Sequence, residues 1–199
     1  MYKYTSKTEW LRLMTFGFRN RNIMETLRIL IEKGQWHEID SILKKMFVDQ
    51  TDSAPFTEAI YLLHTTLLNP STNFPDDGFE KVRQILTKLF EKSSPKFLND
   101  PCYLFFVGYL ITLCDWCFGL DDVTLGIDML RRASELEPSS LLFRWGYSFS
   151  TSQADSEFLS REISKDQEVI SFLASYGDAG KYIEEQIRNL PYFFSLPKE

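Results

Sequence analysis

The chain has 199 residues, of which 44% are hydrophobic and 15% aromatic, enough apolar surface to offset the entropy lost on folding, so we expect a folded protein rather than a disordered one. The net charge is −6, and residues 101–199 contain 15 acidic against 8 basic residues. This surplus disfavours nucleic acid as the main partner and favours a basic protein, although acidic charge also serves solubility.

Capping residues and apolar positions that repeat every three or four residues predict helices along the chain. In chain order, the expected helices cover about residues 7–19, 22–33, 36–47, 55–68, 77–92, 101–118, 121–137, 139–149, 155–163, 166–176 and 178–190. The polar stretch 150–157 is interpreted as a linker or loop, and Leu190-Pro191 is expected to end the last helix.

The fold class predicted from these elements is all-α, because no segment alternates apolar and polar residues over the length of a strand. Gly34 leaves very few residues between the second and third expected helices, so these two should pack antiparallel as a hairpin. We expect about 9–11 helices, stacked as hairpins in a single domain over residues 1–199, with a possible division into 1–97 and 98–199.

Residues 101–114 carry no charge and are mostly apolar. A bilayer-spanning helix needs about 20 apolar residues, so this shorter run predicts a buried central helix and no membrane association. The chain start lacks the apolar run of a signal peptide, and three cysteines in one stretch do not form a disulfide framework, so we expect a cytoplasmic protein.

Motifs for catalysis, cofactors or metals are weak in this sequence. Cys114 and Cys117 form a C-x-x-C motif, but its place near the predicted end of a helix gives the helix dipole the wrong sign for a reactive thiolate. We interpret them as small apolar residues at a helix crossing. Cys102 lies three to four turns away, and His37 and His64 lie far off in sequence, so no zinc site is expected. Nucleotide-binding, zinc-protease and serine-hydrolase motifs do not occur, so we expect no enzyme and no cofactor.

Two further groups of residues leave alternatives open. The basic residues Arg12, Arg19, Arg21 and Arg28 alternate with acidic ones, which favours ion pairs along a helix over an RNA site. The apolar C-terminal residues 192–197 either fold back onto the core or form an exposed anchor at an interface.

Residues 107–140 resemble a tetratricopeptide repeat, which is a pair of antiparallel helices with small residues where they cross and a proline near the end. The positions that match are Leu110, Leu113, Cys114, Cys117, Gly126, Leu130, Ala133 and Pro138. No second copy occurs, so the resemblance implies a tetratricopeptide-like or irregular α-solenoid.

In its overall character, a small acidic helical chain with no site of its own, the protein is similar to bacterial toxin-immunity proteins, including those of contact-dependent growth inhibition. This resemblance implies a non-enzymatic protein that masks a basic, nuclease-type toxin domain. An alternative is a scaffold or chaperone that binds a peptide in a concave groove, and a further one is a hydrolase whose acids converge on a metal. The residues expected to bind the toxin are Asp115, Asp121, Asp122, Asp128, Glu135, Glu137, Asp155, Glu157 and Glu162.

Overall fold

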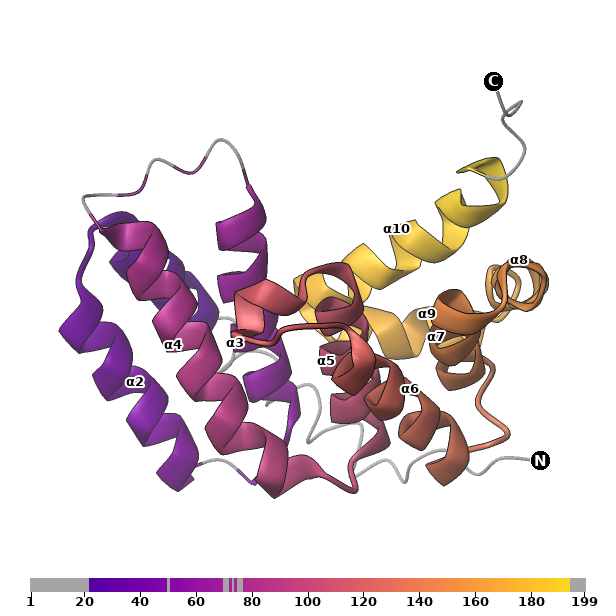
Figure 1. The fold of residues 1–199 in the computed structure, drawn as a ribbon, viewed down its shortest axis with the longest axis horizontal. Coiled ribbons are helices and arrows are strands. Elements are labelled where there is room, and N and C mark those ends of the chain that lie inside the picture. Colours follow the sequence, from indigo (N-terminus) through magenta and orange to yellow (C-terminus); the bar gives the residue numbers. More distant parts are fainter. Residues whose placement is uncertain (1–21, 50, 70–71, 73, 75–76, 194–199) are drawn as a thin grey trace.

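The structure, a computed structural model, describes residues 22–49, 51–69, 72, 74 and 77–193 (Figure 1). The described residues contain ten α-helices, two short 3-10 helices and no strand, so the all-α prediction is confirmed. A helix over residues 22–32 is followed by α2 (Trp36–Asp49), α3 (Ala54–Leu68), α4 (Gly78–Ser93), η1 (Ser94–Phe97), α5 (Pro101–Leu113), η2 (Asp115–Phe118), α6 (Thr124–Leu136), α7 (Leu141–Thr151), α8 (Gln153–Ile163), α9 (Gln167–Ser175) and α10 (Gly177–Phe193). The helix expected over residues 7–19 lies outside the described residues.

The turn between the helix of residues 22–32 and α2 is built on Gly34. Its φ of 64° lies in the left-handed region, a backbone conformation that glycine adopts without steric strain. The N–H of Gln35 donates to the carbonyl of Leu30 at 2.9 Å and that of Gly34 to Ile31 at 3.0 Å, which is the Schellman arrangement that ends helices. The predicted break at Gly34 is therefore confirmed.

Three predicted helix boundaries are wrong. Helix α5 ends at Leu113 rather than near 118, because Cys114 leaves the helical region (φ −159°, ψ 82°) and the Asp115 carboxylate accepts from the N–H of Trp116 at 2.8 Å, which starts a separate turn. Residues 150–157 are not a linker, since α7 and α8 are separated only by Ser152, whose side chain caps α8.

The third boundary concerns Pro191, which does not end α10. This helix continues to Phe193, since a proline removes one backbone hydrogen bond and can bend a helix without stopping it. Residues 194–199 and the side chains of the last residues of α10 are outside the description, so the two alternatives for the apolar C-terminal segment stay open.

Helix α5 is the centre of the fold. Asp100 begins it by accepting from the N–H groups of Cys102 and Tyr103, at 2.9 and 3.1 Å, with Pro101 in the first turn. Residues 103–111 are all buried, so the predicted buried central helix is confirmed. Helices α3, α6 and α7 pack against it, and Tyr176, between α9 and α10, stacks on Phe106 of α5 with ring centroids 4.3 Å apart.

Helices α5 and α6 make the most extensive pairing in the described part of the chain, and two glycines allow it. A Cβ atom on Gly126 would lie 2.8 Å from the carbonyl oxygen of Gly108, and one on Gly108 would lie 2.9 Å from the carbonyl oxygen of Gly126. The backbones therefore touch at this crossing. The tetratricopeptide frame places Cys114 on the first helix of the pair, whereas in the structure Gly108 faces Gly126 and Cys114 lies beyond the helix end.

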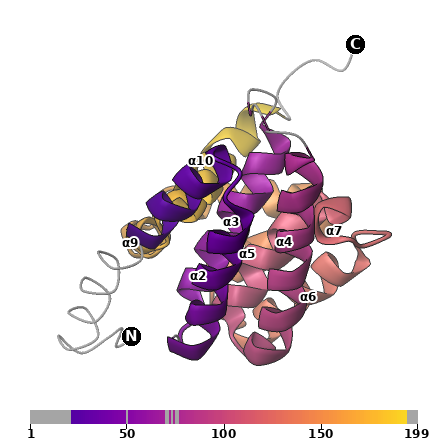
Figure 2. The same ribbon diagram turned by 90° about the vertical axis from the view of Figure 1, so that its left-hand side faces the viewer.

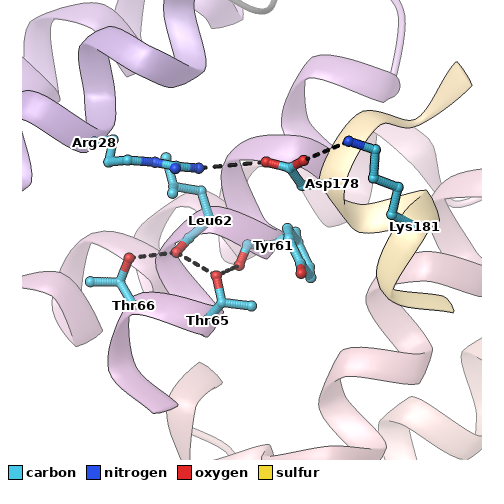
Figure 3. A network of polar contacts seen from close by, with 7 residues as sticks. All are labelled: Arg28, Tyr61, Leu62, Thr65, Thr66, Asp178 and Lys181. Carbon is cyan, nitrogen blue, oxygen red and sulfur yellow. Dashed lines mark hydrogen bonds and ion pairs between the residues drawn. The ribbon is translucent and has the colours of Figure 1, made fainter. Parts of the chain in front are cut away.

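The C-terminal helix returns to the N-terminal half of the chain. Helix α10 packs against α3, where the rings of Tyr61 and Tyr182 are 5.8 Å apart. Beside them Asp178 lies 3.5 Å from Arg28 and 3.6 Å from Lys181, which links the helix of residues 22–32 to α10 (Figure 3). In a linear solenoid each repeat contacts only its neighbours, so this contact makes the arrangement a closed bundle in that region.

No helix in the described ranges combines the length and the apolar character needed to cross a bilayer.

The crossing of α5 and α6 generates the first prediction, for Gly126→Ala. Alanine improves helix propensity by up to about 1 kcal/mol, but forcing a Cβ against a backbone carbonyl costs about 1–3 kcal/mol. We expect a net loss of about 1–2 kcal/mol in the free energy of unfolding, measured by urea denaturation. The matched control is Ser134→Ala on the same helix, which should change it by less than about 0.5 kcal/mol. Equal stability of Gly126→Ala and the wild type would contradict the close crossing.

Candidate functional site

The nine acidic residues predicted to bind a toxin lie on three parts of the C-terminal half. They are found in the turns between α5 and α6 (Asp115, Asp121, Asp122), on α6 and just after it (Asp128, Glu135, Glu137), and on α8 (Asp155, Glu157, Glu162). Helix α6 has 13 residues and is thus about 20 Å long, and α7 packs against both α6 and α8. The acids are therefore spread over this half rather than gathered in one compact patch.

Four of the nine acids have a basic partner three or four residues away in the chain. Arg131 lies 3.2 Å from Asp128 and 2.9 Å from Glu135. On α8, Glu157 pairs with Arg161, and Glu162 lies 3.0 Å from Lys165. These pairs are exposed or half-exposed and about one helical turn apart, so solvent screens them and each contributes little to stability. This pairing within the predicted surface was not expected from the sequence.

The remaining acids differ in their surroundings. The pKa of Glu137 is raised by its partial burial and, in smaller part, by the charge of Asp100. The pKa of Asp122 is lowered, because its carboxylate accepts from the N–H of Thr124, which begins α6. Asp121 and Asp155 are exposed and have no ion pair among the described residues, so they are the acids most available to a partner.

A groove runs between α2 and α4, which lie side by side on the outside of the bundle (Figures 1 and 2). Its volume is about 230 Å³, and its lining combines one face of each helix. Apolar side chains and four lysines form most of that lining: Trp36, Leu43, Phe47, Ile85, Leu89, Lys44, Lys81, Lys88 and Lys92. The groove is therefore amphipathic and basic, in a chain whose net charge is negative.

Asp40 supplies the negative charge within the groove lining. Its carboxylate lies 2.6 Å from Lys44. The hydrogen bond from Lys44 lowers the pKa of Asp40, and the charges of Lys92 and Lys88 lower it further. The three lysines thus create a positive electrostatic potential around Asp40. A carboxylate of a ligand bound at this place in the groove would be attracted by the same lysines.

A third candidate site is buried and joins three elements. His64 comes from α3, Cys114 follows the last residue of α5, and Cys117 lies in η2. One ring nitrogen of His64 and the two Sγ atoms all lie within 4.8 Å of one another, and the two sulfurs are 2.9 Å apart. The exposed fractions are 2%, 5% and 0%. The structure thus brings together a histidine and a C-x-x-C motif that the sequence analysis kept apart.

The polar atoms of this cluster have few partners. Neither ring nitrogen of His64 has a hydrogen bond of ordinary geometry. Burial lowers the pKa of His64 to about 4, an effect offset in part by the backbone carbonyl of Leu110, so the ring is neutral at pH 7. Burial, together with the neighbouring thiol of Cys114, raises the pKa of Cys117, so this thiol is not a reactive thiolate.

Other residues considered in the sequence analysis lie apart from these sites. Cys102 is half-buried on α5, and burial raises the pKa of its thiol to about 12. His37 is exposed in the first turn of α2. Arg28 pairs with Asp178, whereas Arg12, Arg19 and Arg21 are outside the described residues.

Sequence reasoning missed the lysine groove as well as the place of His64. A signal for the groove exists in the spacing, because Lys81, Lys88 and Lys92 recur at one face of the helix predicted over residues 77–92. No such signal exists for His64, because the contact between α3 and η2 depends on tertiary packing.

No protein-family model matches the sequence, and comparisons with curated proteins and with solved structures find no significant match.

The buried histidine generates a prediction about pH. An unfolded histidine binds a proton near pH 6.5, whereas folded His64 resists protonation down to about pH 4. The unfolded state therefore binds more protons in this window, and the free energy of unfolding should fall as the pH falls from 6.5 to 4, by up to about 3 kcal/mol.

Urea denaturation at several pH values in EDTA-containing buffer measures this dependence. In His64→Leu, the free energy of unfolding should no longer fall by this amount between pH 6.5 and 4. In His37→Gln, a change at the exposed histidine, the fall should remain. An unchanged slope in His64→Leu would show that another group causes the acid sensitivity.

Proposed function

We propose that this chain is a non-enzymatic protein-binding protein whose acidic C-terminal half docks a basic protein. The observation that carries the proposal is the charge of residues 101–193, which hold 14 acidic and seven basic residues. Several of the acids are exposed on α6, on α8 and in the turn before α6. Pairs such as Arg131 with Asp128 do not cancel this surplus, because the basic residues are already counted in it.

A surface with this charge favours a partner with a strongly basic surface. Complementary charge speeds association and selects partners, and it does so over distances of about one Debye length. Nuclease toxins need a basic surface to hold nucleic acid, so a nuclease-type toxin domain fits. In this proposal the chain is the cytoplasmic immunity protein that neutralises the toxin by covering that surface.

Charge reversal at the unpaired acids tests the docking surface. The probe is the product of the gene upstream of the chain's own gene, which we expect to contain a basic toxin domain, and association is followed by stopped-flow fluorescence. Asp121→Lys and Asp155→Lys should each slow association several-fold at low salt, with little change in the dissociation rate. About 0.5 M salt should remove most of the difference.

Glu91→Lys is the matched control, because it makes the same charge change at an exposed position on α4 in the other half of the chain. Its association rate should stay within about twofold of the wild type. An upstream product that is neither a toxin nor a binder, or equal slowing by Glu91→Lys, would contradict the proposal.

A second candidate function is peptide binding in the groove between α2 and α4. The observation in its favour is the lining, in which the rings of Trp36 and Phe47 lie with four lysines. A groove of this kind suits a peptide that alternates acidic and large apolar side chains, because the lysines receive the carboxylates and the apolar floor receives the rest.

Fluorescence anisotropy with a labelled peptide of alternating glutamate and phenylalanine tests this candidate. The double variant Lys88→Glu with Lys92→Glu should weaken binding by about tenfold or more, since two attractions become repulsions. The control Lys45→Glu changes an exposed lysine of α2 that does not line the groove and should have little effect. Equal weakening by all variants would mean that binding follows net charge and not the groove.

A further inference from the structure

We propose that His64, Cys114 and Cys117 bind one thiophilic divalent metal ion, with zinc as the best fit. This inference is independent of the proposed binding surfaces. It assigns a metal site to a C-x-x-C motif whose partner comes from a helix about 50 residues earlier in the chain.

The arrangement of the three ligand atoms supports the proposal. In tetrahedral zinc sites the bonds are about 2.3 Å to sulfur and about 2.0–2.1 Å to nitrogen, so ligand atoms lie about 3.5–3.8 Å apart. The three atoms here lie within 4.8 Å of one another. The two sulfurs, at 2.9 Å, would have to move apart by about 0.9 Å to flank an ion. Rotation of the two cysteine side chains can supply such a shift.

The second and independent observation is the unpaired histidine. His64 is 2% exposed, and neither ring nitrogen has a hydrogen bond of ordinary geometry. Buried polar groups in native proteins almost always have a partner, so a buried imidazole that faces two thiols is placed as a metal ligand would be. A metal ion would take the lone pair of one nitrogen. The carbonyl of Leu110, already close enough to influence this ring, is a candidate acceptor for the N–H of the other nitrogen.

Charge and ligand type select the class of ion. Two thiolates and one neutral imidazole balance a divalent ion, so the complex is neutral and can be buried. A monovalent copper ion would leave one uncompensated negative charge. Magnesium and calcium prefer oxygen ligands and do not fit this set. The described residues offer no fourth His, Cys, Asp or Glu atom within the same distance, so a water molecule or an added ligand would complete a tetrahedral zinc site.

The competing outcome is a disulfide between Cys114 and Cys117, which would use the same two sulfurs without His64. Elemental analysis of the full chain, purified with a reducing agent, separates the two. We expect one zinc ion per chain, and with cobalt in place of zinc a thiolate-to-cobalt charge-transfer band together with the intense visible bands of a tetrahedral ion. A disulfide in the reduced preparation, or absence of metal after zinc is added, would overturn the proposal.

Variants assign the ligands. Cys114→Ser and His64→Leu should each lower the zinc content and weaken the cobalt charge-transfer band, whereas Cys102→Ser, which changes the cysteine outside the cluster, should keep both. Loss of metal in Cys102→Ser as well would overturn the assignment.

Thermal unfolding shows whether a variant that binds no metal is still folded. Without metal, His64→Leu should be at least as stable as the wild type, because it removes unpaired polar atoms from the core. With zinc at about a hundred times its dissociation constant, the wild-type melting temperature should rise by about 5–10 °C, and that of His64→Leu should not. An equal response of the two proteins to zinc, or a His64→Leu variant less stable than the metal-free wild type, would contradict the proposal.

Discussion

Helix α5 has no polar face over its nine central residues, and the rest of the fold follows from the need to cover it. A helix of this kind is stable only when other elements surround it. Helices α3, α6 and α7 do so directly, and Tyr176, between α9 and α10, covers Phe106. The glycine contact at Gly108 and Gly126 brings α6 close enough to exclude solvent from one side. Helix α10 returns to the N-terminal half through its packing on α3.

The same constraint separates the interior from the charged surface. The helices that pack on α5 turn apolar faces inward, and the charged side chains lie outside them, with acids along α6 and α8 and lysines along α2 and α4. Where α5 ends, the chain enters η2 and carries Cys114 and Cys117 inward against His64. The described part of the molecule thus has a basic groove between α2 and α4, acids along α6 and α8, and one buried cluster at the end of α5.

Local signals in the sequence predict the helices well and the sites poorly. Gly34 ends a helix through backbone hydrogen bonds within a few residues, and Asp100 caps α5 within three, so both boundaries could be predicted. The end of α5 could not, because apolar residues continue past Leu113 and only the local turn at Asp115 breaks the pattern. The nearness of His64 to the cysteines depends on how α3 packs, for which a single sequence carries no periodic signal. The ion pairs of Arg131 were predictable from spacing and were missed.

Native-state hydrogen exchange measured residue by residue tests the central role of α5 most directly. If this helix is the element that the others are built to cover, its amides should exchange only through global unfolding, with protection equal to the global free energy of unfolding. The outer helices α2 and α8 should open locally and exchange faster. Exchange in α5 that is as fast as in α2 or α8, under conditions where the protein is folded, would contradict the account.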